Sequence, residues 1–297
     1  MKAFPFLSLA CVLAVGLTPV ASAESLVGVT TTNTLVTFDS ASPGIVVGSV
    51  GISGLQAGET ILGIDFRPAT LTLYGLGSVS RLYSINQTTG VATQVGSAGA
   101  FVLSGTAFGF DFNPTVDRIR VVSNTGQDLR LNPNDGTLTA TDTALAYAAA
   151  DINAGATPRI VGAAYTNNFA GATTTTLYDI DSNLDILATQ NPPNAGTLNT
   201  VGALGFNTSD LVGFDISGLT GASFASMSSP TGVSSQLFTI NLASGAATLL
   251  GTIGFSTALV DISVAAAPIP EPETHALMAI GLLAVSAVAR RRQRRTS

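Results

Sequence analysis

Four aspartates recur within short apolar segments, and carboxylates are groups that transfer protons or bind hard cations. They are Asp65, Asp111, Asp215 and Asp261, at intervals of 46, 104 and 46 residues. The long interval spans two units of a repeat, with Ala164 in place of the missing aspartate. One hypothesis is a ring of carboxylates that lines a channel and binds a cation or serves as acid and base. The other, which we favour because the aspartates follow the repeat, is a structural role as acceptors of backbone hydrogen bonds.

A second set of oxygen-bearing side chains resembles the start of a calcium-binding loop. Its members are Asp179, Asp181, Asn183 and Asp185. Such a loop needs a glycine at its sixth position and a glutamate at its twelfth, and this chain has Leu184 and Gln190 there. Asx residues also favour turns, because their side chains bond to nearby backbone. We therefore expect a structural turn and no cofactor, with Ca²⁺ as the alternative.

Residues 24–267 contain no cysteine, no histidine and no lysine, since Cys11, His275 and Lys2 lie outside this range. This composition excludes disulfides, cysteine nucleophiles, histidine-dependent triads and His/Cys zinc sites from that part of the chain. Six arginines against sixteen acidic residues give it a net charge near −10. Such a domain lacks the basic patch that nucleic acid requires, and it disfavours polyanionic polysaccharide in the absence of divalent cations.

The few arginines have two interpretations as well. Arg67 and Arg118 follow the aspartate motifs and could pair with Asp65, Asp111 or Asp117. A site for an acidic sugar is the alternative, but we favour structural ion pairs.

The elements that position these residues form a repeat of about 46 to 53 residues. Each unit has an apolar segment that carries the aspartate, a second strand, and a hairpin whose turn contains Asn, Asp or Ser with Gly. The hairpin strands begin with Leu35–Asp39, Leu82–Asn86, Leu177–Asp181 and Leu237–Asn241, and more weakly with Leu129–Asn132. Units of four strands at this period are typical of β-propeller blades. Only residues 144–150 (ALAYAAA) suggest a short helix.

We expect an all-β fold, a five-bladed β-propeller, with a β-solenoid or a sandwich as alternatives. Residues 26–50 supply hairpin strands without a first strand, and residues 259–264 supply a first strand without a hairpin. Pairing of these N- and C-terminal strands would complete one blade from both ends of the chain. It would also close the ring and remove the exposed sheet edge.

Both ends of the sequence carry sorting features. Residues 1–23 have a basic start, an apolar run and the small residues Ala21 and Ala23. These features are typical of a signal peptide that signal peptidase removes. Residues 268–297 contain Pro270-Glu271-Pro272, an apolar segment at 275–289 and a basic cluster at 290–295. The arginines of that cluster favour the cytoplasmic side and would stop transfer of a transmembrane helix. They are Arg290, Arg291, Arg292, Arg294 and Arg295.

The C-terminal features resemble the PEP-CTERM sorting signal of exopolysaccharide-producing Gram-negative bacteria. The resemblance implies export, a transient membrane anchor, and processing by an exosortase that leaves the protein at the cell surface or outside the cell. Residues 59–68, 107–122 and 191–194 resemble a family of exported bacterial domains of unknown function. That resemblance supports the export and the propeller but implies no activity and no catalytic residue.

These observations lead to two expectations for residues 24–267. The first, which we favour, is a non-enzymatic role in binding or scaffolding within the exopolysaccharide matrix. The second is a carboxylate-dependent hydrolase or lyase that acts on polysaccharide. Carboxylates that leave the repeat and cluster with Tyr or Arg would favour the enzyme, and a channel lined by small and apolar residues would favour the scaffold.

Overall fold

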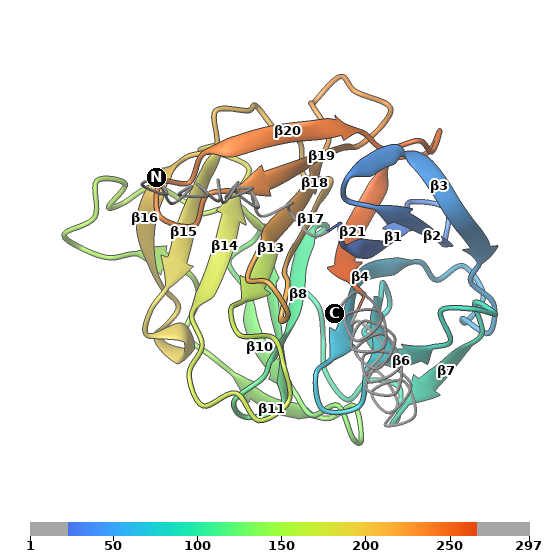
Figure 1. Ribbon diagram of the computed structural model, residues 1–297. Coiled ribbons are helices and arrows are strands. Elements are labelled where there is room, and N and C mark those ends of the chain that lie inside the picture. Colours follow the sequence, from blue (N-terminus) through green and yellow to red (C-terminus); the bar gives the residue numbers. More distant parts are fainter. Residues whose placement is uncertain (1–22, 266–297) are drawn as a thin grey trace, which may run out of the picture.

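The alternating apolar residues of the repeat form strands, as expected for segments buried on one face and bounded by turns. The computed structural model describes residues 23–265, and the strands in this range form five separate sheets. The sheets stand around a common centre like blades (Figure 1). The expected all-β, five-bladed propeller is thereby confirmed, in place of a solenoid or a sandwich.

We number the sheets blades 1 to 5 around the ring, each from its innermost strand outward. Blade 1 contains β21 (Leu259–Val264), β1 (Ser25–Thr30), β2 (Thr34–Asp39) and β3 (Ser42–Gly51). Blade 2 contains β4 (Ile61–Arg67), β5 (Thr72–Gly77), β6 (Arg81–Ile85) and β7 (Ala92–Val95). Blade 3 contains β8 (Phe108–Asn113), β9 (Arg118–Ser123), β10 (Asp128–Leu131) and β11 (Leu138–Thr141).

The last two blades follow the same order. Blade 4 contains β13 (Ile160–Tyr165), β14 (Leu177–Asp181), β15 (Ile186–Gln190), β16 (Thr197–Ala203) and β12 (Ala146–Tyr147). Blade 5 contains β17 (Val212–Ile216), β18 (Ser223–Met227), β19 (Gln236–Ile240) and β20 (Ala247–Thr252). A short 3₁₀ helix, η1 (Pro193–Ala195), connects β15 to β16.

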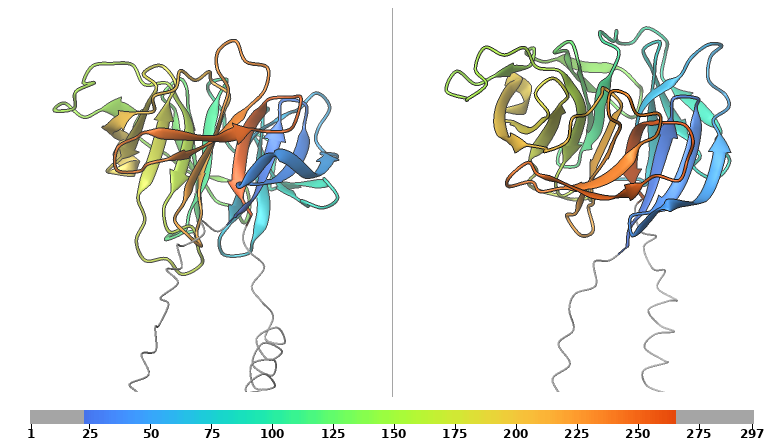
Figure 2. Two further views of the ribbon diagram at one scale, coloured as in Figure 1. Left: turned by 45° about the horizontal axis from the view of Figure 1, so that its top comes forward. Right: turned by 90° about the horizontal axis from the view of Figure 1, so that it is seen from above.

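Strands from both ends of the chain complete blade 1. β21 pairs antiparallel with β1, and Leu26 lies opposite Val264. Just beyond the pair, the Ala265 N–H donates to the Ser25 carbonyl over 2.9 Å. Figure 2 shows the first strands and the last one side by side. The expected closure of the ring by terminal strands is therefore confirmed, and it leaves β21 paired instead of exposed as an edge.

The five innermost strands contact one another around the centre, and the glycine of their shared motif permits this approach. A Cβ atom added at Gly109 would lie 2.6 Å from the Ala163 Cβ on the next strand. At Gly213 it would lie 2.3 Å from the Ile262 nitrogen. Any larger residue would push the blades apart, so the glycine that precedes each Phe-Asp pair has a packing role.

Hydrophobic side chains fill the space between neighbouring blades. Between blades 2 and 3, Phe110 and Phe112 pack with residues of both sheets, and the Tyr74 and Phe112 rings meet edge to face at 5.2 Å.

The helix suggested for residues 144–150 is wrong. Ala146 and Tyr147 form β12, which pairs parallel with β16, and the Tyr147 hydroxyl donates to Asp181 over 2.6 Å. These tertiary contacts override the weak helical preference of so short a segment.

Candidate functional site

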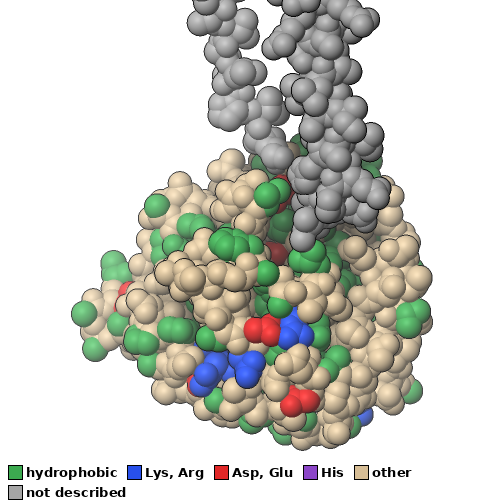
Figure 3. Space-filling model, turned by 60° about the horizontal axis from the view of Figure 1, so that its bottom comes forward, with side chains coloured by type: hydrophobic (Ala, Val, Ile, Leu, Met, Phe, Trp, Pro, Cys, Tyr) green, Lys and Arg blue, Asp and Glu red, His purple; other side chains and the backbone are tan. Residues whose placement is uncertain are grey.

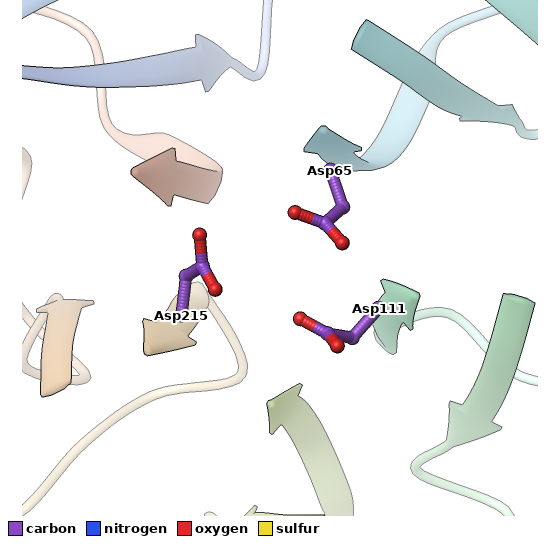
Figure 4. Close-up of side chains that lie close together, drawn as sticks. All are labelled: Asp65, Asp111 and Asp215. Carbon is purple, nitrogen blue, oxygen red and sulfur yellow. The ribbon is translucent and has the colours of Figure 1, made fainter. Parts of the chain in front are cut away.

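Three of the repeat aspartates meet at the centre of the ring. Asp65 on β4, Asp111 on β8 and Asp215 on β17 point toward one another (Figure 4). One carboxylate oxygen from each residue lies within 4.8 Å of one from each of the other two, and each residue is about 1% exposed. Since hard cations prefer carboxylate oxygens, the cluster has the composition of a cation site. Its three members come from three different blades.

The same aspartates join neighbouring blades through backbone hydrogen bonds. Asp65 accepts a bond of 2.9 Å from the Phe112 N–H on β8. Asp111 accepts one of 3.1 Å from the Tyr165 N–H on β13. β17 and β21 are joined in the same way. Each carboxylate thus satisfies an inner-strand donor that its own sheet does not bond, which is the structural role favoured from the repeat.

Asp215 on β17 accepts a bond of 2.6 Å from the Val264 N–H on β21. This register places Ser263, and not Asp261, level with the other three aspartates. The Ser263 hydroxyl lies 2.8 Å from Asp65 Oδ1 and 3.0 Å from Asp215 Oδ2. The predicted alignment of Asp261 with the repeat aspartates is therefore wrong by two residues, and Ser263 occupies that position.

Asp261 itself accepts a bond of 2.8 Å from the Ile64 N–H. It also joins two blades, one layer away from the cluster. Residues 261 and 263 face the same side of β21, because side chains alternate along a strand. The sequence alone could not decide between them, since the two choices differ only in the register of β21 against β17 and β4.

Burial controls the protonation of the central carboxyls. It raises the pKa of Asp65, and the nearby Asp215 adds to the effect. It raises the pKa of Asp111 as well, with repulsion from Asp65 as the next cause. For Asp215, burial raises the pKa to about 6. A hydroxyl donates a single hydrogen bond, so Ser263 can bond to both of its neighbours only if one carboxyl carries a proton.

The four residues of the calcium-like loop are placed in different surroundings. Asp181 accepts bonds from the Asn183 N–H at 2.8 Å and from the Tyr147 hydroxyl, so both its oxygens are occupied. Asp185 accepts from the Thr208 N–H at 2.9 Å. Asp179 is fully buried, and neither of its oxygens has a partner among residues 23–265. The segment forms the structural turn that the Asx residues favour.

Arginines form ion pairs inside and between blades. Arg67 donates to Asp117, one of the partners suggested by the sequence. Arg120 is 1% exposed and contacts Asp128 and Asp142, with 2.7 Å to the latter. Its Nη2 donates to the Asn194 Oδ1 of blade 4 over 2.8 Å, and its Nε donates to the Tyr165 hydroxyl over 3.3 Å. Sequence reasoning missed this network, because Asn194 lies 74 residues from Arg120 and meets it only where blades 3 and 4 contact each other.

A cavity of about 1160 Å³ opens on one face of the ring, beside the ends of β1 and β21. Its charged lining residues are Glu24 and Asp215, and no Arg or Lys of the described part of the chain lines it. Asn168 also lines it, and the Asn168 Oδ1 is a buried oxygen without a hydrogen-bond partner among the described residues. On the face shown in Figure 3, charged side chains are few; some acidic ones lie deep in a hollow with hydrophobic side chains around it, and others lie on the open surface.

The wall of the cavity is built from apolar and neutral polar side chains. The larger apolar ones are Val27, Leu35, Val47, Val50, Phe66, Leu71, Phe169, Ile216, Leu219 and Val264. The neutral polar ones are Ser25, Thr37, Ser49, Thr70, Gln87, Thr88, Asn168 and Ser217. Sequence reasoning missed this cavity, because its wall comes from blades 1, 2, 4 and 5 and no local motif marks it.

The fold and its inter-blade carboxylates define a class, a single five-bladed propeller of about 240 residues that the two ends of the chain close. The chain belongs to the family described as "Domain of unknown function (DUF4394)", which matches residues 34–263. The PEP-CTERM protein-sorting motif matches residues 268–295. The chain is thus an exported protein that carries an exosortase-related sorting signal for the cell surface.

Other comparisons add little. No curated protein matches the chain. Among solved structures, Kuenenia stuttgartiensis hydrazine synthase is 12% identical, with a TM-score of 0.39, over 68% of this chain and 51% of that one. Dihydro-heme d1 dehydrogenase NirN in complex with DHE is 13% identical, with a TM-score of 0.37, over 78% of this chain and 44% of that one. This chain therefore spans about half the length of either structure.

The remaining predicted sites lie outside residues 23–265. They are the cleavage-site Ala21, the tripeptide Pro270, Glu271 and Pro272, the segment 275–289, and the arginines at 290–295. Within residues 23–265, no helix has the length and apolar character needed to cross a membrane.

Proposed function

We propose that the propeller is a non-enzymatic binding module outside the cell, which holds a neutral polysaccharide of the extracellular matrix in the cavity. The Asn168 Oδ1 carries this proposal, since a buried acceptor without a partner is costly unless a ligand or water donates to it. A sugar hydroxyl is such a donor. Asn168, which bears this oxygen, is one of the residues that line the cavity.

The rest of the lining supports the same class of ligand. Thr37, Thr88 and Gln87 offer neutral donors and acceptors, and Phe66 and Phe169 offer aromatic faces. Sites for small ligands have this combination of apolar surface and a few polar groups. Acidic residues are the only charged groups in the lining that the structure describes, so a polyanionic saccharide would be repelled.

The alternative is a carboxylate-dependent hydrolase or lyase for polysaccharide, and one observation favours it. Asp215 reaches the cavity, and burial raises its pKa to about 6, a range suited to a general acid. However, the Ile216 and Val264 N–H groups and the Ser263 hydroxyl occupy its two oxygens. A carboxyl held in this way has no free oxygen to direct at a glycosidic bond, so binding is the better supported function.

Calorimetric titration with neutral and uronic-acid oligosaccharides, with and without Ca²⁺, tests the proposal. We expect binding of neutral oligosaccharides only. Asn168→Ala should weaken it about tenfold, the value of one hydrogen bond of about 1.4 kcal/mol. The control is Asn183→Ala, an exposed asparagine outside the cavity. Binding that is equal in Asn168→Ala and the wild type, or that is restricted to uronic acids, would contradict the proposal.

A further inference from the structure

One face of the ring presents an apolar residue on each of four loops. These loops follow the inner strands β4, β8, β13 and β17, so they leave the ring in the same direction. Their exposed apolar residues are Leu71 at 41%, Val116 at 56%, Phe169 at 48% and Leu219 at 72%. Leu71, Phe169 and Leu219 stand at the cavity, and Val116 occupies the corresponding loop of blade 3. Three exposed apolar side chains at one opening, with a fourth on the corresponding loop of blade 3, are typical of an interaction surface.

The fifth inner strand leads from the same face into the sorting tail. β21 ends at Val264, and Ala265 lines the cavity. The apolar segment 275–289 begins ten residues later. Ten residues of extended chain span at most about 35 Å. Where that segment is inserted in a membrane, the face with the four apolar loops is therefore held within about 35 Å of the lipid.

Charge on this face does not oppose such a contact. Asp117, next to Val116, is paired with Arg67. Glu24 is 7% exposed and accepts a hydrogen bond from the Thr220 hydroxyl. These two carboxylates are thus paired or covered, and Arg118 donates to the Asp117 carbonyl over 2.8 Å, which lowers the cost of bringing these groups to a lipid surface.

We propose that this face docks on the outer surface of the membrane that holds the tail, with Leu71, Val116, Phe169 and Leu219 in the interfacial layer. The proposal depends on the expected insertion of residues 275–289 and goes beyond sugar binding. Apolar side chains that enter the interface gain affinity in proportion to the area they bury. Because Leu71, Phe169 and Leu219 stand at the cavity, docking covers its opening, and release from the membrane uncovers it.

Fluorescence quenching by lipid tests this contact in the chain that starts at residue 24. That chain contains no cysteine, so a single Leu219→Cys accepts an environment-sensitive dye. The chain is reconstituted through its tail into phosphatidylethanolamine and phosphatidylcholine vesicles with brominated acyl chains. The matched controls are Val102→Cys and Ile152→Cys, which are 73% and 89% exposed on loops that precede inner strands, at the opposite face.

We expect a blue shift and a loss of fluorescence at position 219 and not at 102 or 152. Equal quenching at all three positions would overturn the proposal. So would a blue shift at 219 that needs no vesicles, which would indicate self-association. A shift that appears only with oligosaccharide would assign the face to the sugar and overturn docking as well.

A second variant separates docking from proximity due to the tether. With the dye at Phe169→Cys, the changes Leu71→Ser, Val116→Ser and Leu219→Ser should reduce quenching to that of the dye at 152. Circular dichroism checks that this variant is folded. Quenching that persists would show that the tail alone brings the face near lipid, which contradicts docking. The calorimetric test compares the wild type with Asn168→Ala and uses none of these docking variants. The two proposals can therefore fail separately.

Discussion

The central aspartates join the blades at the expense of burying their own charge. Asp65, Asp111 and Asp215 each accept a backbone N–H from the next inner strand. No Arg or Lys donates to them among residues 23–265. Buried carboxyls without a cationic partner hold their protons to higher pH. The stability of the ring should therefore depend on pH in a way that surface carboxylates would not produce.

We predict that the free energy of unfolding falls between about pH 4 and pH 7. A carboxyl whose pKa is higher in the folded protein stabilises it fully below the unfolded pKa, and this contribution is lost as pH rises through the folded pKa. For Asp215 the pKa rises from 3.8 to about 6, which amounts to about 3 kcal/mol. Burial also raises the pKa of Asp128 to about 6, so it adds in the same direction.

Urea unfolding from pH 3 to pH 8 measures this effect. Asp111→Asn should flatten the slope, because it removes one buried group that titrates. Below about pH 4, stability should decrease as the pH is lowered. Arg159 lowers the pKa of Asp210, so protonation of Asp210 at low pH breaks their ion pair. Stability that is constant or rises from pH 4 to pH 7 would contradict this account of the cluster.

Removal of divalent cations gives a second prediction for the same residues. Backbone donors and shared protons already stabilise the buried carboxyls of Asp65 and Asp215. Neither EDTA nor Ca²⁺ at about 1 mM should therefore change the melting temperature. Differential scanning calorimetry at pH 7 checks this. A rise with Ca²⁺ that Asp111→Asn abolishes would instead make the cluster a calcium site.

Among the elements, β9, β10 and η1 meet at a buried arginine. Arg120 contacts Asp128, Asp142 and, across the blade boundary, Asn194. We predict that Arg120→Met destabilises the fold by about 3–5 kcal/mol, because the buried Asp128 loses its cationic partner, whereas Asp142 keeps Arg130. Arg159→Met is the control. Its pair with Asp210 is half exposed and should be worth at most about 1 kcal/mol. Similar losses in both variants, measured by urea unfolding, would contradict a structural role of the network.

At the level of elements, the repeat predicted the fold well. Hairpin turns, the apolar segments that carry the repeat aspartates and the incomplete units at both ends predicted five blades and their closure. The register of β21 was not predictable, because positions 261 and 263 face the same side of one strand. β12 was missed because its pairing with β16 is parallel and distant in sequence.

For the whole molecule, the sorting motif and the propeller were both evident in the sequence, but the cavity was not. Its wall joins β1, β2 and β3 with loops of blades 2, 4 and 5. Those loops lie far apart along the chain, and only ring closure brings them together. The proposed binding and membrane docking both depend on this cavity, so we expect them of the closed ring and not of a single blade.

The most direct test of the account measures binding and turnover in one experiment. The chain from residue 24 is incubated with the neutral oligosaccharide that binds best, and the products are analysed by mass spectrometry. The account predicts saturable binding that Asn168→Ala weakens, with the oligosaccharide recovered intact. Shortened or unsaturated products that disappear in Asp215→Asn, a variant checked for folding by circular dichroism, would contradict it and show the propeller to be an enzyme.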